Sequence, residues 1–508
     1  MNQLFPLRSA RPCLLLFTLA FLAAIAPAHG AAKPEVTAKP DVLVVLCDQW
    51  SPRYLSWDNP QVRTPHLDAI AREGMIFDAC YVTSPVCMPS RTSLVTGLYP
   101  HNAGHSVWGN VNGWHVDAEA APMFRDIRAA GYTTAQIGKL HWFSGPTWRR
   151  EFDKVEDYHQ ALGLDYVVDV SGPPSADGGG DAYSRYLRER GLLKKTADDL
   201  HERYVKWEFE PRASVVATAD YHDVFVTDKA VEFVGRQPAD KPLCLVVSLH
   251  SPHPPLDAPG DYATMYDPQT LKLPANVPEI FVRESHEIEP AELRRMLANY
   301  LGKISLADAQ IGKLVAAMKK RGTWDNTLFV FTADHGEMMG AHGSLTKGRF
   351  YEESVRVPLV MRMPGTVKAG RTAALAQMMD VYPTIVEAVD GDYSPGRFAV
   401  SQWPVATAHS KQVRSAVLSE ISKGPHQQLM ARDARYKWWI QDEEEYLFDL
   451  ETDPLERDNL AGRSEHAETQ NRLRNVALTQ LRTAQTNLAA GSKSKVQRLR
   501  EAEAAKKK

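Results

Sequence analysis

Short runs of almost wholly apolar, β-branched residues recur along the chain and predict the strands of a buried sheet. The clearest runs cover residues 42–46, 243–249, 327–331 and 357–361, and a shorter strand-like segment at 133–137 ends at Gly138. Continuous apolar runs, unlike alternating ones, are typical of strands that are covered on both faces. We therefore expect most of these strands to lie inside the protein.

Helical patterns lie between the apolar runs, at residues 64–74, 121–131 and 290–322. Gly322 supplies a stop at the end of the longest one. Alternating strands and helices predict an α/β fold with a mostly parallel central sheet and helices on both faces. The chain has 508 residues, of which 44% are hydrophobic, so it can bury a large core and a smaller second one.

The rhythm changes in three places, which predicts the domain organisation. We expect the main domain at residues 38–385, with residues 150–215 as an insertion that forms a wall or lid. A smaller α+β subdomain follows at 386–465, where residues 428–440 and 446–450 predict strands of an antiparallel sheet. Residues 466–508 are rich in charge and predict a helical, solvated tail.

The first thirty residues resemble a secretory signal peptide. Arg8 and Arg11 precede an apolar run at residues 13–28, and small residues follow at Ala28 and Gly30. The run is shorter than the roughly 20 residues that a spanning helix needs, so we expect no stable membrane insertion. The sequence thus predicts an exported protein, periplasmic or secreted, with an uncleaved anchor as the alternative.

The net charge argues against a nucleic-acid partner, and the cysteine content argues against a disulfide-stabilised fold. A net charge of −3 supplies no field that would attract nucleic acid, so the partner is expected to be a small or polymeric solute. Four cysteines follow the leader, too few for a disulfide framework: Cys47, Cys80, Cys87 and Cys244. Cys47 and Cys244 lie in apolar strands. A disulfide between Cys80 and Cys87 remains open.

Polar side chains follow four of the predicted strands. They are Asp48 and Gln49, Lys139 and His141, His250 and His253, and Asp334 and His335. The carboxyl ends of parallel strands meet at one edge of a sheet, so we expect these groups to lie together. The oxygen-rich set of Asp48, Gln49, Asp334 and His335 favours Ca²⁺, with Mg²⁺ or Mn²⁺ possible.

The segment from Cys87 to Gly97 carries the most specific pattern. Pro89 is suited to the first turn of a helix, which places Cys87 at the helix N-terminus, where the backbone dipole favours negative charge. Arg91 follows four positions later, on the same face of the helix.

This segment resembles the sulfatase signature, which reads Cys, any residue, Pro, Ser, Arg, four residues, Thr, Gly. The resemblance continues through residues 138–141, 251–254, 332–337, 347–358 and 446–460, so that it covers about residues 40–460. It implies an alkaline phosphatase-like fold. It also implies that a formylglycine-generating maturation enzyme converts Cys87 to 3-oxoalanine, or formylglycine.

The resemblance assigns roles to the remaining residues. The hydrated aldehyde at position 87 attacks the sulfur of a sulfate monoester, giving a covalent sulfo-enzyme and then free sulfate. Arg91, Lys139 and Lys347 would hold sulfate and diol oxygens, and His141 would be the base. His253 and Lys347 match the residues near the leaving oxygen, where a proton donor is needed.

Two features leave the substrate open. One common family pattern has Asp-Asp and Asp-Asn, whereas Asp48-Gln49 and Asp334-His335 resemble branches with choline sulfatases and phosphonate monoester hydrolases. Four aromatic residues near the motifs point weakly toward a sulfated carbohydrate, although core or loop packing explains such residues more often: Trp50, Trp108, Trp114 and Trp142. The alternatives are phosphate or phosphonate ester hydrolysis, choline or aryl sulfates, and a binding protein in which Cys87 never matures.

Overall fold

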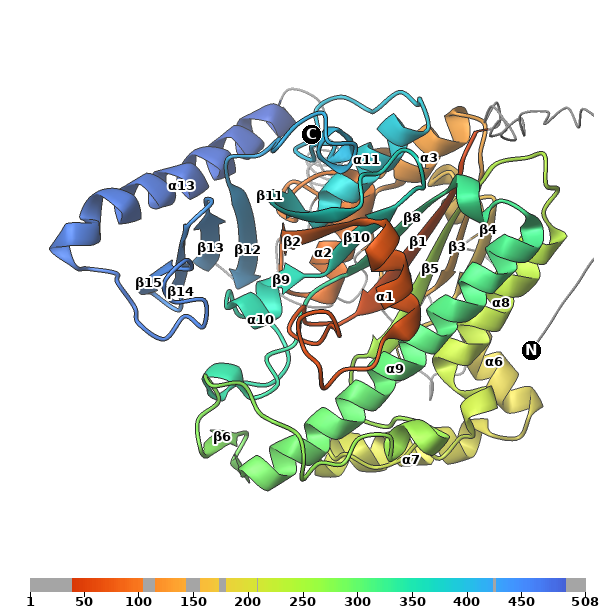
Figure 1. Cartoon of the computed structure of the whole chain (residues 1–508), viewed down its shortest axis with the longest axis horizontal. Coiled ribbons are helices and arrows are strands. Elements are labelled where there is room, and N and C mark those ends of the chain that lie inside the picture. Colours follow the sequence, from red (N-terminus) through yellow and green to blue (C-terminus); the bar gives the residue numbers. More distant parts are fainter. Residues whose placement is uncertain are drawn as a thin grey trace, which may run out of the picture. The chain divides into compact units, whose positions relative to one another are not determined.

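A computed structural model describes residues 39–103, 115–142, 156–172, 180–207, 209–423 and 426–489 (Figure 1). They belong to a unit that spans Ala38–Lys508. The predicted leader at residues 1–30, Trp108, Trp114 and the end of the tail lie outside the described residues. Within those residues, no helix has both the length and the apolar character needed to cross a bilayer.

A nine-stranded sheet forms the centre of this unit. Its order is β11-β2-β10-β8-β1-β5-β3-β4, with β9 paired to β2. The strands are β1 (Asp41–Asp48), β2 (Met75–Tyr81), β3 (Thr133–Gly138), β4 (Tyr166–Asp169), β5 (Leu243–Pro252), β8 (Thr327–Ala333), β9 (Arg356–Val357), β10 (Leu359–Arg362) and β11 (Gly370–Gln377). Strands β8, β1, β5, β3 and β4 are neighbours and parallel, which confirms the mostly parallel α/β fold.

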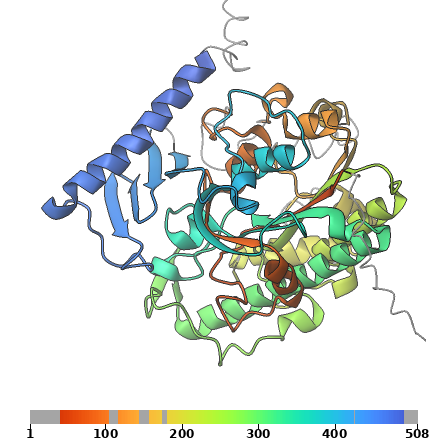
Figure 2. The ribbon, with the colours of Figure 1, turned by 45° about the horizontal axis from the view of Figure 1, so that its top comes forward.

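Helices cover both faces of this sheet, as the alternating pattern predicted. On one face α1 (Pro65–Glu73), α8 (His222–Arg236) and α9 (Pro290–Arg321) pack together, and on the other α2 (Cys87–Thr96), α3 (Met123–Ala129) and α11 (Val381–Ala388) do so (Figure 2). Gly322 has a φ of 84° and ends α9, as expected from the sequence. Every residue of β1 is buried between these layers.

Two predicted segments differ in detail from the structure. The expected strand at residues 357–361 is broken at Pro358, which lacks the N–H that a strand ladder needs, and β10 then runs antiparallel to β8 and β2. Part of the expected insertion, β4, pairs with β3 and therefore extends the main sheet. The rest of that stretch contains α5 (Glu156–Ala161), α6 (Ala182–Glu189) and α7 (Leu193–Lys206). Its role as a lid stays a prediction.

A four-stranded antiparallel sheet follows near the C-terminus, made of β12 (Val417–Lys423), β13 (His426–Arg432), β14 (Tyr436–Gln441) and β15 (Glu444–Asp449). The single strand expected at residues 428–440 is wrong, because a turn separates β13 from β14. In that turn the Asp433 carboxylate accepts the backbone N–H groups of Arg435 and Tyr436, at 2.9 and 2.7 Å. Helix α13 (Ala467–Ala489) packs on this sheet through Leu473 and Ala477.

Candidate active site

The four polar strand ends come together at one edge of the main sheet. Strand β1 lies between β8 and β5, with Cys47 opposite Ala333 on one side and Leu249 on the other. Strand β3 lies on the far side of β5. The residues that follow these strands therefore emerge side by side, as the sequence predicted.

The backbone turns sharply where β3 leaves the sheet. Gly138 has a φ of 106°, and a Cβ at this position would lie 2.0 Å from the carbonyl oxygen of Ser248. Only glycine fits this approach. The turn directs Lys139 and His141, whose own φ is 57°, toward the site.

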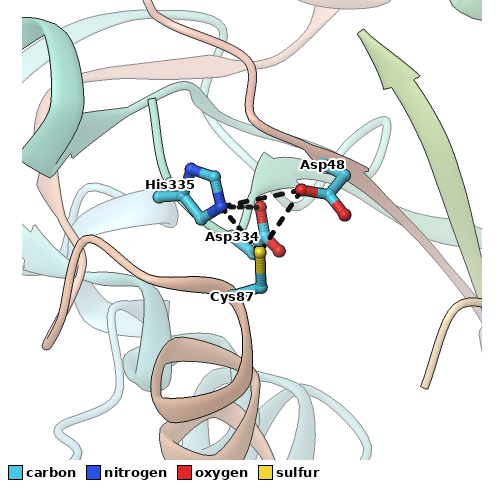
Figure 3. A group of neighbouring side chains, drawn as sticks. All are labelled: Asp48, Cys87, Asp334 and His335. Atoms are coloured by element: carbon cyan, nitrogen blue, oxygen red, sulfur yellow. Dashed lines mark hydrogen bonds and ion pairs between the residues drawn. The ribbon is translucent and has the colours of Figure 1, made fainter. Parts of the chain in front are cut away.

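Cys87 is the first residue of α2, whose ten residues are all buried. Its Sγ lies 3.1 Å from Nε2 of His335 and 3.8 Å from Oδ1 of Asp48 (Figure 3). The same Sγ lies 3.2 Å from Nζ of Lys347. Burial raises the pKa of the Cys87 thiol, but the charges of Lys139, Lys347 and His335 outweigh burial and hold that pKa well below its ordinary value. The site thus stabilises negative charge at this atom.

The alternative disulfide is not formed in the structure. Cys47, Cys80, Cys87 and Cys244, the cysteines among the described residues, are all free and buried. Cys80 lies on β2, opposite Ala376 of β11, whereas Cys87 begins a helix.

Two carboxylates and an imidazole surround Cys87. One side-chain ligand atom each from Asp48, Asp334, His335 and Cys87 lies within 4.8 Å of the others. Nδ1 of His335 donates to the carbonyl oxygen of Gly336 at 2.9 Å, which leaves Nε2 facing the carboxylates. An oxygen-rich set with one imidazole fits a hard divalent cation, and this carbonyl contact orients the imidazole as in metal sites.

Buried cations balance the two carboxylates. Nε of Arg91 lies 2.7 Å from Oδ2 of Asp334, and Nη1 donates to Oγ of Ser248 at 2.7 Å. Lys139 donates to the carboxylate of Asp48. Burial lowers the pKa of His335, but the charge of Asp334 outweighs burial and raises that pKa overall. Each of the two buried carboxylates is thus paired with a basic side chain.

Gln49 connects two parts of the site. Its Oε1 accepts a hydrogen bond from Nζ of Lys347 at 2.7 Å, and its Nε2 donates to Glu337. Glu337 also accepts the backbone N–H groups of Met339 and Thr346, at 2.8 and 2.7 Å. The amide of Gln49 is therefore oriented from both sides, and metal coordination by it stays a prediction.

Two further histidines, His253 and His141, interact with the Cys87 side chain. Nδ1 of His253 donates to the carbonyl oxygen of Pro254 at 2.7 Å, so its Nε2 accepts from Nζ of Lys347 at 2.8 Å. Burial and the charge of Lys347 lower the pKa of His253. Burial and the charge of Lys139 lower the pKa of His141, which forms a side-chain hydrogen bond with Cys87. Both imidazoles are thus biased toward the neutral form.

Several residues that support the site carried no predicted role. Glu337 lies within a motif whose pattern predicts no function for it. Ser248, Tyr300 and Asp223 lie in regular elements that offer no local signal. The hydroxyl of Tyr300 donates to the backbone oxygen of Gln49 at 2.8 Å. Asp223 accepts the backbone N–H of His250 at 2.6 Å.

Of the four tryptophans, Trp50 and Trp142 lie among the described residues, and both are buried in the core. Trp50 is 0% and Trp142 is 2% exposed, and their rings contact Phe331 and Phe124. For these two residues the core reading holds, and they carry no argument about the substrate.

Comparison with known proteins places this site in a family. The sulfatase family model matches residues 40–391, and a model described as N-sulphoglucosamine sulphohydrolase, C-terminal, matches residues 340–484. An arylsulfatase of Clostridium perfringens is 26% identical over 90% of this chain and 97% of its own length. An N-acetylglucosamine-6-O-sulfatase of Bacteroides thetaiotaomicron is 24% identical over 93% of this chain and 91% of its own.

A solved structure gives the same result for the fold. The phosphonate monoester hydrolase of Agrobacterium radiobacter has a TM-score of 0.72 and 25% identity, covering 88% of this chain and 96% of its own. With the family model matching more than half of the sequence and the Cys87 motif at the centre of the site, the chain belongs to the sulfatase family and is a hydrolase of sulfate esters.

Proposed function

We propose that this sulfatase removes sulfate from a sulfated carbohydrate after maturation of Cys87 to formylglycine. The observation that carries the proposal is the convergence of Lys139, Lys347 and His335 on the Cys87 side chain at the N-terminus of α2. Fixed cations in a buried site stabilise the charge that develops on a sulfuryl group far better than cations in water. The matured residue would supply an oxygen nucleophile that attacks sulfur.

Sulfatases are typically metal-dependent, and Asp48, Asp334 and His335 would hold the ion, with Gln49 beside them. We propose Ca²⁺, with Mg²⁺ and Mn²⁺ as alternatives. The bound ion would act as a Lewis acid on a sulfate oxygen.

The remaining roles, which are sulfate binding and proton transfer, belong to side chains of the protein. Lys139 and Lys347 hold positive charge where the sulfate oxygens would lie, and Arg91 holds the Asp334 carboxylate in place. His141 contacts position 87 in a neutral form and suits the base. Lys347 donates to His253, and this pair would deliver a proton to the leaving oxygen.

The carbohydrate assignment is supported by names among the relatives. One relative is an N-acetylglucosamine-6-O-sulfatase, and the C-terminal family model is described as N-sulphoglucosamine sulphohydrolase. A screen of sulfated mono- and oligosaccharides, choline O-sulfate and aryl sulfates for free sulfate tests this. Turnover of choline O-sulfate or aryl sulfates without any sugar sulfate would overturn the carbohydrate assignment.

Phosphonate ester hydrolysis is the second candidate, because the phosphonate monoester hydrolase has the same fold. Parallel assays of p-nitrophenyl sulfate and p-nitrophenyl phenylphosphonate separate the two. We expect kcat/KM to favour the sulfate by about 10-fold or more, a difference in transition-state binding of about 1.4 kcal/mol. A preference of that size for the phosphonate would reverse the assignment.

Maturation can be tested on the peptide that contains Cys87. The matured peptide should be lighter by the difference between a thiol-bearing and an aldehyde-bearing side chain, and it should react with hydrazides. A disulfide-linked Cys80–Cys87 peptide in fully active enzyme would overturn the proposal.

We also propose export, from the basic and then apolar pattern of the first thirty residues. N-terminal sequencing of the enzyme from a periplasmic or culture fraction should begin near Ala31. Activity confined to the cytoplasm, with Met1 retained, would argue against export.

A further inference from the structure

The segment that carries His253 cannot be held by an ordinary backbone ladder. Pro252, Pro254 and Pro255 surround His253 and have no N–H, so the backbone N–H of His253 is the only main-chain donor of these four residues. It donates to the carbonyl oxygen of His250 at 3.1 Å. The position of the segment therefore depends on what its carbonyl oxygens contact.

A buried lysine of α9 contacts two of these carbonyl oxygens. Lys303 is 0% exposed, and its Nζ donates to the oxygen of His253 at 2.6 Å and to that of Pro255 at 2.8 Å. The third contact is with Oδ1 of Asp257 at 3.1 Å, and the hydroxyl of Tyr221 donates to the same oxygen. An ammonium group has three N–H donors, so Lys303 is fully used by this segment.

The carbonyl group of Pro254, between those of His253 and Pro255, determines the orientation of the His253 imidazole. The oxygen of Pro254 accepts Nδ1–H of His253, and Nε2 of His253 then faces Nζ of Lys347. A shift of the segment would move the Pro254 oxygen, the His253 ring and its contact with Lys347 together. Lys303 is thus linked to the reacting region although it does not contact Cys87.

We infer that Lys303 is a positioning residue that sets His253 and Lys347 against the leaving oxygen. The inference rests on the proposed role of that pair in protonating the leaving group. A misplacement of about 1 Å near a reacting centre can cost on the order of 100-fold in rate. The loss should be greatest for substrates whose leaving group needs a proton most.

The same helix offers a matched control. Arg321 has a side chain that is 3% exposed, pairs with Asp41 at 2.9 Å, and donates to the carbonyl oxygens of Gln237, Pro238 and Lys241. Like Lys303, it joins an acid and several loop carbonyls to α9. It does so where β1 and β5 begin, at the edge of the sheet away from the site.

The experiment compares Lys303→Met with Arg321→Met on p-nitrophenyl sulfate and phenyl sulfate. Phenol is the poorer leaving group of the two and depends more on proton donation. We expect Lys303→Met to lower kcat/KM for phenyl sulfate about 10-fold more than for p-nitrophenyl sulfate. Arg321→Met should leave the ratio between the two substrates unchanged, whatever it does to stability.

A second variant decides the matter if Lys303→Met does not fold. Lys303→Gln keeps a polar group of similar length and should shift the ratio in the same direction by a smaller factor. An unchanged ratio in a folded Lys303 variant, or an equal change in Arg321→Met, would overturn the inference. If the wild-type enzyme prefers phosphonates, the same ratio is measured on p-nitrophenyl and phenyl phosphonates, so failure of the sulfatase proposal is recognised separately.

Discussion

Two buried clusters of charge invite comparison, because they are built from similar residues and do different things. The Cys87 cluster contains Asp48, Cys87, Arg91, Lys139, Asp334, His335 and Lys347. The Lys437 cluster lies where the C-terminal sheet meets the main domain and contains Arg53, His342, Glu352, Glu353, Lys437 and Glu456. In both, most of the acidic and basic groups are buried, whereas the Arg53 side chain of the Lys437 cluster is 21% exposed.

The Lys437 cluster neutralises itself. Lys437 lies 2.7 Å from Glu352 and 2.5 Å from Glu456, and Arg53 lies 2.7 Å from Glu353. Ligand atoms of His342, Glu353 and Glu456 lie within 4.8 Å of one another, a spacing that resembles a metal site. These carboxylates are paired with basic side chains, as those of the Cys87 cluster are, but no reactive side chain lies among the residues of this cluster.

The Cys87 cluster differs because several of its polar groups surround one reactive atom, the Sγ of Cys87. Lys347 and His335 contact one sulfur atom directly, and Lys139 adds its charge to that atom at the start of a helix. In the Lys437 cluster each ion pair joins a basic side chain to a carboxylate, and no reactive atom lies between them. Burial of charge alone therefore does not identify an active site; convergence of charge on one reactive atom does.

Replacing the reactive atom should separate the clusters most strongly. Cys87→Ala should lower kcat by about 10⁴-fold or more, because no nucleophile remains, while the fold and the ion-binding carboxylates are retained. Sulfate release and thermal melting measure this. The control is Cys244→Ala, which removes a buried free thiol of β5 and should leave kcat within about 2-fold of wild type. A kcat in Cys87→Ala that falls by much less than about 10⁴-fold would contradict the assignment of Cys87 as the nucleophile.

Breaking the self-neutralised cluster should affect folding more than chemistry. Lys437→Met leaves Glu352 and Glu456 buried without their shared cation, and we expect a loss of about 3–5 kcal/mol in the free energy of unfolding. Urea denaturation measures it. Lys194→Met breaks an exposed pair with Asp198 and should cost less than about 1 kcal/mol. Unchanged stability with lost turnover would place Lys437 in the chemistry.

We expect the metal ion to bind at the Cys87 cluster and not at the Lys437 cluster. Asp334→Asn removes one carboxylate ligand, and we expect the affinity for Ca²⁺ to fall about 100-fold in isothermal titration calorimetry. Glu353→Gln makes the same change in the Lys437 cluster and should leave that affinity unchanged. The reverse result would show that the ion binds beside His342.

The smallest expected effect is a change in the pH dependence of stability. Burial and the charges of Glu352 and Glu353 outweigh Lys437 and raise the pKa of Glu456 from 4.5 to about 8. The folded state then binds a proton that the unfolded state releases, so stability from this group is complete below about pH 4.5 and is lost as pH rises to about 8.

Glu456→Gln should remove this slope. Relative to wild type, the variant should gain on the order of 1–3 kcal/mol between pH 5 and pH 8 in urea denaturation. Glu352 has the opposite sign: burial disfavours its charge, but Lys437 and Arg356 hold its pKa well below the usual range. The deficit of Glu352→Gln relative to wild type should therefore grow as pH rises toward about 4.5 and stay constant above that pH. Parallel curves for all three proteins would refute the assignment.

Much of the site could be read from the sequence, because its signals are local. An apolar run followed at once by polar residues predicts a strand end, and parallel strands bring such ends to one edge. This reasoning places Asp48, Lys139, His253 and Asp334 at one edge of the sheet. The proline two positions after Cys87 likewise predicted a helix that begins at the cysteine.

Tertiary structure alone decided how those side chains are held. Gln49 bonds to Glu337, 288 residues away, and to Lys347, 298 residues away. In the sequence Lys303 is one of several lysines in a helical pattern. Only the fold brings its Nζ to the carbonyl oxygen of His253. Strand ends and helix starts depend on neighbouring residues, whereas the partner of a buried polar group depends on which distant segments pack against it, and a single sequence carries no signal for that choice.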